Sequence, residues 1–240
     1  MKVITNIFGS SLGKKYIMAV TGFVLFLFVI GHMVGNLQIF LGPEAINRYG
    51  YFLQNLGEGL WLVRAVLLAV ILLHIWSAIK ISAENKAARP IAYAEYNPVA
   101  SSYASRTMLM SGLIILAFII YHLLHFTVQA KAINLTGQDF HAFSEPIKGT
   151  MGLERHDIYK MMIVGFSNLW VSLFYVIAVG LLCLHLSHGI SAMFQSMGWK
   201  NKVYGPFLDR AARVIAWLLF IGYSSIPVAI LLGFGKEALK

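Results

Sequence analysis

Charged side chains are scarce in this sequence. Only 12% of its 240 residues are Asp, Glu, Lys or Arg, whereas 58% are hydrophobic and the mean hydropathy is +0.71. Soluble domains carry about 25% charged residues, so this composition excludes a soluble domain. It indicates a chain whose surface faces lipid.

Cysteine is almost absent as well. The single Cys183 cannot form an internal disulfide, and it cannot hold an iron–sulfur cluster, which normally takes four thiolates. The sequence also lacks a glycine-rich dinucleotide-binding fingerprint. The sequence therefore gives no sign that this chain binds a flavin or an iron–sulfur cluster.

Five long apolar runs provide what a membrane protein needs. A hydrocarbon core of about 30 Å takes about 20 helical residues, and runs of this length cover 16–41, 59–81, 107–128, 161–187 and 214–234. The first run leads directly into a polar loop at 42–57 without a cleavage pattern, which argues against a signal peptide. We predict one membrane domain over 1–240, an all-α bundle of five transmembrane helices with an external loop at 129–160.

Basic residues determine the predicted orientation. One side of the bundle collects 11 of the 19 Lys and Arg against three acids, and the other side has eight against seven; Lys2, Arg89 and Glu95 belong to the first side. The side rich in basic residues faces the cytoplasm, which places the N-terminus there. The net charge of +9 is then mainly a topological signal, with some attraction to anionic lipid, and it does not indicate nucleic-acid binding.

Four histidines lie inside four of the apolar runs, where an ionisable residue is costly and usually functional. At 1.5 Å per helical residue, His32 and His122 both lie about 25 Å from the cytoplasmic side. His74 lies about 20 Å below Trp61, an expected interface anchor, and His185 comes late in the descending fourth helix. We therefore predict an outer pair, His32 with His122, and an inner pair, His74 with His185.

Two histidines at one depth on different helices can supply both axial nitrogens of a haem iron, so two levels predict two haems. A single membrane histidine could instead act as hydrogen-bonding glue between helices, but four in two matched layers favour ligation. The residues alone leave the choice within each nearby pair open, because His125 and His188 follow His122 and His185 by three residues and share their helix faces. We assign His125 and His188 to hydrogen bonding beside the ligands, one turn closer to water.

The histidines stand in local patterns along successive helices: Gly31-His32-Met33-x-Gly35-Asn36, Leu73-His74, Tyr121-His122 and His185-x-Ser187-x-Gly189. Over nearly the whole chain, this order resembles the di-haem cytochrome b membrane anchor of bacterial succinate:quinone oxidoreductases, the succinate dehydrogenase and fumarate reductase family. The resemblance implies His122 rather than His125, because the ligand follows an aromatic residue. It implies His185 rather than His188, because the ligand precedes x-Ser-x-Gly.

The resemblance also implies a division of labour. A flavoprotein with FAD and an iron–sulfur subunit would dock on the cytoplasmic face and interconvert succinate and fumarate. This chain, in the bacterial inner membrane, would hold two haem b groups and exchange electrons with quinone, with menaquinone expected from the di-haem type. The implied path runs from the iron–sulfur subunit through the inner and outer haems to quinone near the outer surface. A higher oligomer of the complex is compatible with this arrangement, and so is either direction of the reaction.

A quinone site needs an apolar slot and polar donors for the carbonyl oxygens. Near the predicted outer haem, the candidates are Asn36, Gln38, Glu58 and Arg64, with Trp61 as a stacking wall. Three of these side chains also suit roles away from quinone: Trp61 suits an interface aromatic, Glu58 suits a helix start and Arg64 could meet a haem propionate.

Three alternatives stay open. A cytochrome b anchor of the hydrogenase or nitrate reductase type would keep the haems and change the soluble partner. A proton-coupled transporter with a histidine relay would need a polar route, yet Asp and Glu are absent from the predicted helix centres. A purely structural anchor would bind no haem.

Overall fold

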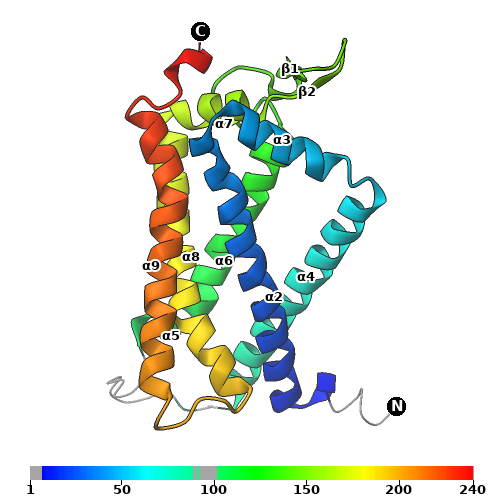
Figure 1. The fold of residues 1–240 in the computed structure, drawn as a ribbon. Helices are drawn as coiled ribbons and strands as arrows, with labels where there is room; N and C mark the ends of the chain where they lie inside the picture. Colours follow the sequence, from blue (N-terminus) through cyan, green and yellow to red (C-terminus); the bar gives the residue numbers. More distant parts are fainter. Residues whose placement is uncertain (1–6, 89–90, 92–101, 240) are drawn as a thin grey trace. The chain divides into compact units, whose positions relative to one another are not determined.

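The computed structural model describes residues 7–88, 91 and 102–239, so Lys2, Arg89 and Glu95 lie outside the described residues. Within the described ranges, five helices are long and apolar enough to span a membrane (Figure 1): Ser11–Leu41, Glu58–Ala87, Met108–Thr127, Leu169–Ser196 and Gly205–Leu231. The prediction of a mainly helical chain with five such helices is confirmed. The side of the membrane that holds the N-terminus stays a prediction.

The elements follow one another along the chain in this order. The first span consists of α2 (Ser11–Leu37) and the 3-10 turn η1 (Gln38–Leu41), followed by α3 (Pro43–Gln54) and α4 (Glu58–Ala87). The short α5 (Tyr103–Arg106) precedes α6 (Met108–His122), which continues as the π-helical turn η2 (Leu123–Thr127). The segment 129–157 contains η3 (Phe140–Ala142) and the antiparallel strands β1 (Ser144–Pro146) and β2 (Glu154–His156). The chain ends with α7 (Ile158–Ser167), α8 (Leu169–Ser196), α9 (Gly205–Leu231) and η4 (Lys236–Leu239).

The segment 42–57, predicted as a polar loop, contains the helix α3. Pro43 occupies one of its first positions and Glu44 lies in its first turn. Both residues favour a helix start, because proline fixes a helical φ and a carboxylate suits the positive end of the helix dipole.

The helix predicted over 161–187 is divided at Asn168, whose backbone is extended (φ −79°, ψ 120°). Its side-chain oxygen accepts a hydrogen bond from the backbone N–H of Trp170 at 2.9 Å and so caps α8. On the other side of the break, the Ser172 hydroxyl donates to the carbonyl of Phe166 at 2.7 Å. Both bonds stabilise the break, and α7 is a separate apolar helix.

The chain forms two compact units. Unit 1 comprises Met1–Val29, Val63–Leu113 and Leu182–Trp217, and unit 2 comprises Ile30–Leu62, Ile114–Leu181 and Leu218–Lys240. Within either unit, the described parts of the five long helices do not pack backbone against backbone over an extended stretch.

Two ion pairs connect helix ends within unit 1. The buried Lys14 ammonium lies 2.5 Å from the Glu84 carboxylate, which joins α2 to α4. The Lys200 ammonium lies 2.7 Å from the Asp209 carboxylate, and the Ser191 hydroxyl also donates to Asp209, which joins the end of α8 to α9. Each charge that leaves water thereby keeps a partner of opposite sign.

Unit 2 contains an apolar core where α3 and α7 cross. Its buried side chains include Ile39, Ile46, Ile163, Phe166 and Tyr175. A Cβ atom on Gly50 of α3 would overlap Cδ1 of Ile158, so a larger residue there would force the Ile158 side chain to move.

Arg155 of β2 connects the β1–β2 hairpin to α3. Its buried guanidinium group lies 2.6 Å from the carboxylates of both Glu44 and Glu145. The hydrogen bond from Arg155 lowers the pKa of Glu44 below its ordinary 4.5. This pairing therefore stabilises the folded cap above that pH, and its contribution is lost as the pH falls through the lowered pKa.

One buried amide joins α3 to the start of α7. The Asn47 side chain is fully buried; its nitrogen donates to the Asp157 carboxylate at 2.9 Å and its oxygen accepts from the backbone N–H of Tyr159 at 2.8 Å. Asp157 in turn caps α7 by accepting from the backbone N–H of Lys160 at 2.9 Å.

We expect Asn47→Leu to lower the free energy of unfolding by about 2 kcal/mol, because it removes two buried hydrogen bonds of about 1 kcal/mol each. Thermal unfolding of the detergent-purified protein measures the loss. Asn55→Leu is the matched control, because exposed Asn55 donates only to the Tyr51 carbonyl of its own helix. Equal destabilisation by the two variants would contradict the bridging role of Asn47.

Candidate functional site

The inner pair lies together in unit 1. His74 of α4 and His185 of α8 have ring centroids 6.5 Å apart, and their ring planes are inclined by 63°. Gly22 of α2 allows the His74 ring to lie close to that helix, since a Cβ there would come within 3.2 Å of His74 Cε1. Two helices thus present one imidazole each to a shared space.

A buried hydroxyl group contacts each ring of the inner pair. Thr21 Oγ1 of α2 lies 3.1 Å from Nδ1 of His74, and Ser111 Oγ of α6 lies 3.2 Å from Nδ1 of His185. Thr21 also lines an apolar hollow of about 310 Å³ in unit 1, together with Tyr16, Ile17, Val20 and Leu73. Thr21 therefore lies between this hollow and His74, and one nitrogen of each inner-pair ring has a hydroxyl group within hydrogen-bonding distance.

The outer pair lies together in unit 2. His32 of α2 and His122 of α6 have ring centroids 5.6 Å apart, with ring planes inclined by 85°. The Tyr175 hydroxyl of α8 lies 3.3 Å from Nδ1 of His122 and 3.0 Å from Nδ1 of His125. One phenol oxygen is thus shared by two histidines that are three residues apart.

His125 has surroundings unlike those of His122. It lies in the π-helical turn η2 and is fully buried, with ring centroids 4.0 Å from Phe126 and 5.7 Å from Phe140. Its ring contacts among the described residues are with Tyr121, Phe126, Phe140 and Tyr175. His122, rather than His125, therefore lies against His32.

His188 is half-buried near the end of α8. His185, rather than His188, is the residue that faces His74. The structure thus brings four of the six candidate histidines into two facing pairs.

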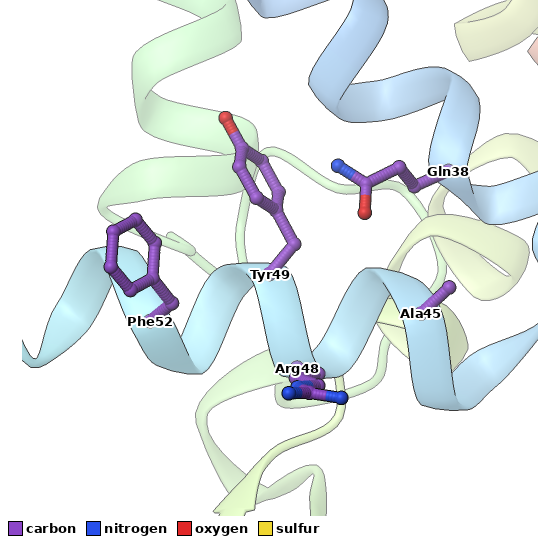
Figure 2. A pocket seen from close by; sticks show the side chains of 5 residues that line it. All are labelled: Gln38, Ala45, Arg48, Tyr49 and Phe52. Atoms are coloured by element: carbon purple, nitrogen blue, oxygen red, sulfur yellow. The ribbon is translucent and has the colours of Figure 1, made fainter.

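Gln38 lines a cavity of about 480 Å³ in unit 2 with Ala45, Arg48, Tyr49 and Phe52. Figure 2 shows the Gln38 side chain across from the face of α3 that carries Ala45 and Tyr49. The last four lining residues follow a helical i, i+3, i+4, i+7 spacing. Sequence reasoning missed them because the polar character of 42–57 favours a loop, although this spacing could have revealed the helix.

The other predicted quinone contacts are not among the residues that line this cavity. Asn36 is half-buried in the last turn of α2, and Glu58 and Trp61 are exposed at the start of α4. Arg64, also exposed, belongs to unit 1. Gly35 precedes Asn36 in α2 and leaves room for the Tyr49 ring of α3, because a Cβ at position 35 would lie 2.7 Å from that ring.

The spacing of both pairs fits axial ligation of one metal ion by two imidazoles. A histidine nitrogen binds a metal at about 2 Å, so two rings on opposite sides of one ion have centroids about 6 Å apart. The observed 5.6 Å and 6.5 Å lie on either side of this value. In the described ranges, no group of three or more His, Cys, Asp or Glu side chains is arranged to hold an ion directly, whereas haem needs only two protein ligands.

No protein-family model, curated protein or solved structure matches this chain.

We expect Tyr175→Phe to lower the free energy of unfolding by about 1–3 kcal/mol, because Nδ1 of fully buried His125 loses its partner. The melting temperature of the detergent-purified protein reports the change. Tyr121→Phe is the matched control, since its half-buried hydroxyl donates to the Ile133 carbonyl at 3.4 Å, near the outer limit for a hydrogen bond. A Tyr121 variant as unstable as the Tyr175 variant would argue against the shared phenol.

Proposed function

We propose that this chain is the membrane anchor and quinone-reactive cytochrome b subunit of a bacterial succinate:quinone oxidoreductase. The observation that carries the proposal is the two facing histidine pairs, His74 with His185 and His32 with His122. The ring spacing within each pair would suit two imidazole ligands of one iron. The sequence patterns around these four histidines support the same family.

Two b-type haems, when bound, would supply one-electron transfer within the membrane. His74 and His185 would hold one of them, and His32 and His122 the other. Apolar helices around each pair keep the imidazoles neutral, which is the form that binds iron. The hydroxyl groups of Thr21, Ser111 and Tyr175 lie within hydrogen-bonding distance of Nδ1 of His74, His185 and His122, and so orient these three rings.

The proposed setting of the protein is a bacterial cytoplasmic membrane. The chain would cross it several times, with its N-terminus in the cytoplasm. A flavoprotein with FAD and an iron–sulfur subunit would bind on that side and carry out the succinate and fumarate chemistry. The expected membrane substrate is a quinone, menaquinone by resemblance.

The cavity beside Gln38 is the best-supported quinone site. A quinone needs a donor for a carbonyl oxygen and apolar walls for its ring. The Gln38 amide can donate, and the rings of Tyr49 and Phe52 line the same cavity. The Arg48 guanidinium group adds a positive charge that can stabilise negative charge on the reduced quinone ring.

The deciding experiment is a reduced-minus-oxidised absorption spectrum with haem quantitation on the detergent-purified complex. Two b haems per chain, with a flavoprotein and an iron–sulfur protein copurifying, are expected. Two haems with a hydrogenase or nitrate reductase partner would reject the succinate assignment. An assembled preparation without haem would reject the cytochrome assignment and favour a transporter or a structural anchor.

Histidine variants test which residue of the third span is the ligand. We expect His122→Leu to lose one haem, because an axial nitrogen disappears, whereas His125→Leu keeps both, because His125 lies among aromatic rings away from His32. Haem content per chain is the measurement. Retention of both haems in the His122 variant together with loss in the His125 variant would reverse the assignment.

Gln38→Leu tests the quinone site. We expect the KM for a soluble quinone analogue to rise about tenfold, the equivalent of one lost hydrogen bond, while haem content stays at the wild-type level. Gln54→Leu, an identical change at an exposed position at the end of the same helix as Tyr49, should leave the KM unchanged. Unchanged kinetics in the Gln38 variant would place the quinone elsewhere.

A further inference from the structure

The hydrogen atom of the Thr21 hydroxyl is already used within its own helix. Thr21 is buried, and its Oγ1 donates to the carbonyl of Ile17 at 2.6 Å. A hydroxyl has one hydrogen to donate and two lone pairs. Toward Nδ1 of His74, 3.1 Å away, the Thr21 oxygen can therefore only accept.

The direction of this bond determines the tautomer of His74. A neutral imidazole carries its hydrogen on one nitrogen, and the other nitrogen keeps a lone pair. Because the Thr21 oxygen accepts from Nδ1, the hydrogen lies on Nδ1 and the lone pair on Nε2. Metal ligation requires that free lone pair.

The second histidine of the inner pair has the same arrangement on a different helix. Ser111 is buried and its hydroxyl donates to the carbonyl of Met108 at 3.1 Å, while its oxygen lies 3.2 Å from Nδ1 of His185. The bond from a serine or threonine back to its own helix is a common helical feature. Here it leaves the oxygen as an acceptor for the imidazole N–H, so Nε2 of His185 also keeps its lone pair.

We infer that Thr21 and Ser111 are positioning residues that fix the tautomers of the two inner-pair histidines and raise their basicity as iron ligands. The inference rests on the proposed function and deepens it. An acceptor on the second nitrogen of a ligating histidine orients the ring and increases its electron donation to the metal. Stronger donation stabilises the oxidised metal, so both hydroxyls lower the reduction potential of the haem held by His74 and His185.

The test is a reductive titration of the purified whole complex, followed through the haem absorption bands, with Thr21→Val and Ser111→Ala. In each variant we expect the equilibrium between oxidised and reduced inner haem to shift about tenfold toward the reduced form, because one hydrogen bond is lost. A tenfold shift corresponds to a rise of about 59 mV in the reduction potential of a one-electron couple. The component that disappears in His74→Leu identifies the inner haem. The other haem should titrate as in the wild type.

Conservative and matched variants separate this role from a general effect on folding. Thr21→Ser and Ser111→Thr keep the hydroxyl and should restore the wild-type potential. Thr107→Val should leave the potential unchanged, because the Thr107 hydroxyl donates to carbonyls of its own segment, those of Tyr103 and Ala104. The electron paramagnetic resonance spectrum of the oxidised inner haem is a second readout, and its g-values should change only in Thr21→Val and Ser111→Ala.

The outcomes distinguish this inference from the proposed function. Two haems with wild-type potentials and g-values in both Thr21→Val and Ser111→Ala would overturn the inference and leave the proposed function intact. Equal shifts in Thr107→Val would overturn it as well. A wild-type complex without haem would remove both. If one of the two variants fails to assemble, the other still decides, because it acts on a different ligand from a different helix.

Discussion

A polar group placed among membrane helices has no water to bond with, so it must find its partner within the protein. The inner-pair rings meet this requirement through Thr21 and Ser111, and His122 and His125 meet it through Tyr175. The same constraint explains the pairing of Lys14 with Glu84. Each of these bonds also connects two helices. The same hydrogen bonds therefore satisfy the buried polar groups and position the histidines of the site.

The five spans could be predicted from the sequence because apolar length alone decides whether a helix can cross a membrane. Two other features could not be found in this way. The break at Asn168 is a capping event inside an apolar run, where average hydropathy hides one polar residue. The helix α3 is amphipathic and short, so its polar face resembles a loop until its helical spacing is considered.

The histidine pairs could be anticipated because depth along a helix is a count of residues. Their hydroxyl partners could not, since Thr21 is 53 residues from His74 and Ser111 is 74 residues from His185. No local pattern joins such positions, and serine and threonine in apolar helices commonly bond only to their own backbone. The Gln38 cavity could be predicted only in part, because its other walls belong to α3, a helix whose polar residues favour a loop.

The shared phenol of Tyr175 couples two histidines through a single hydrogen atom. Tyr175 can donate to only one of the two Nδ1 atoms and must accept from the other. If His122 is a ligand through Nε2, its hydrogen lies on Nδ1 and is donated to the phenol oxygen. The phenol hydrogen then goes to His125, whose own hydrogen must lie on Nε2, a buried atom without a hydrogen-bond partner among the described residues. The ligand assignment at His122 thus determines the donor direction of His125.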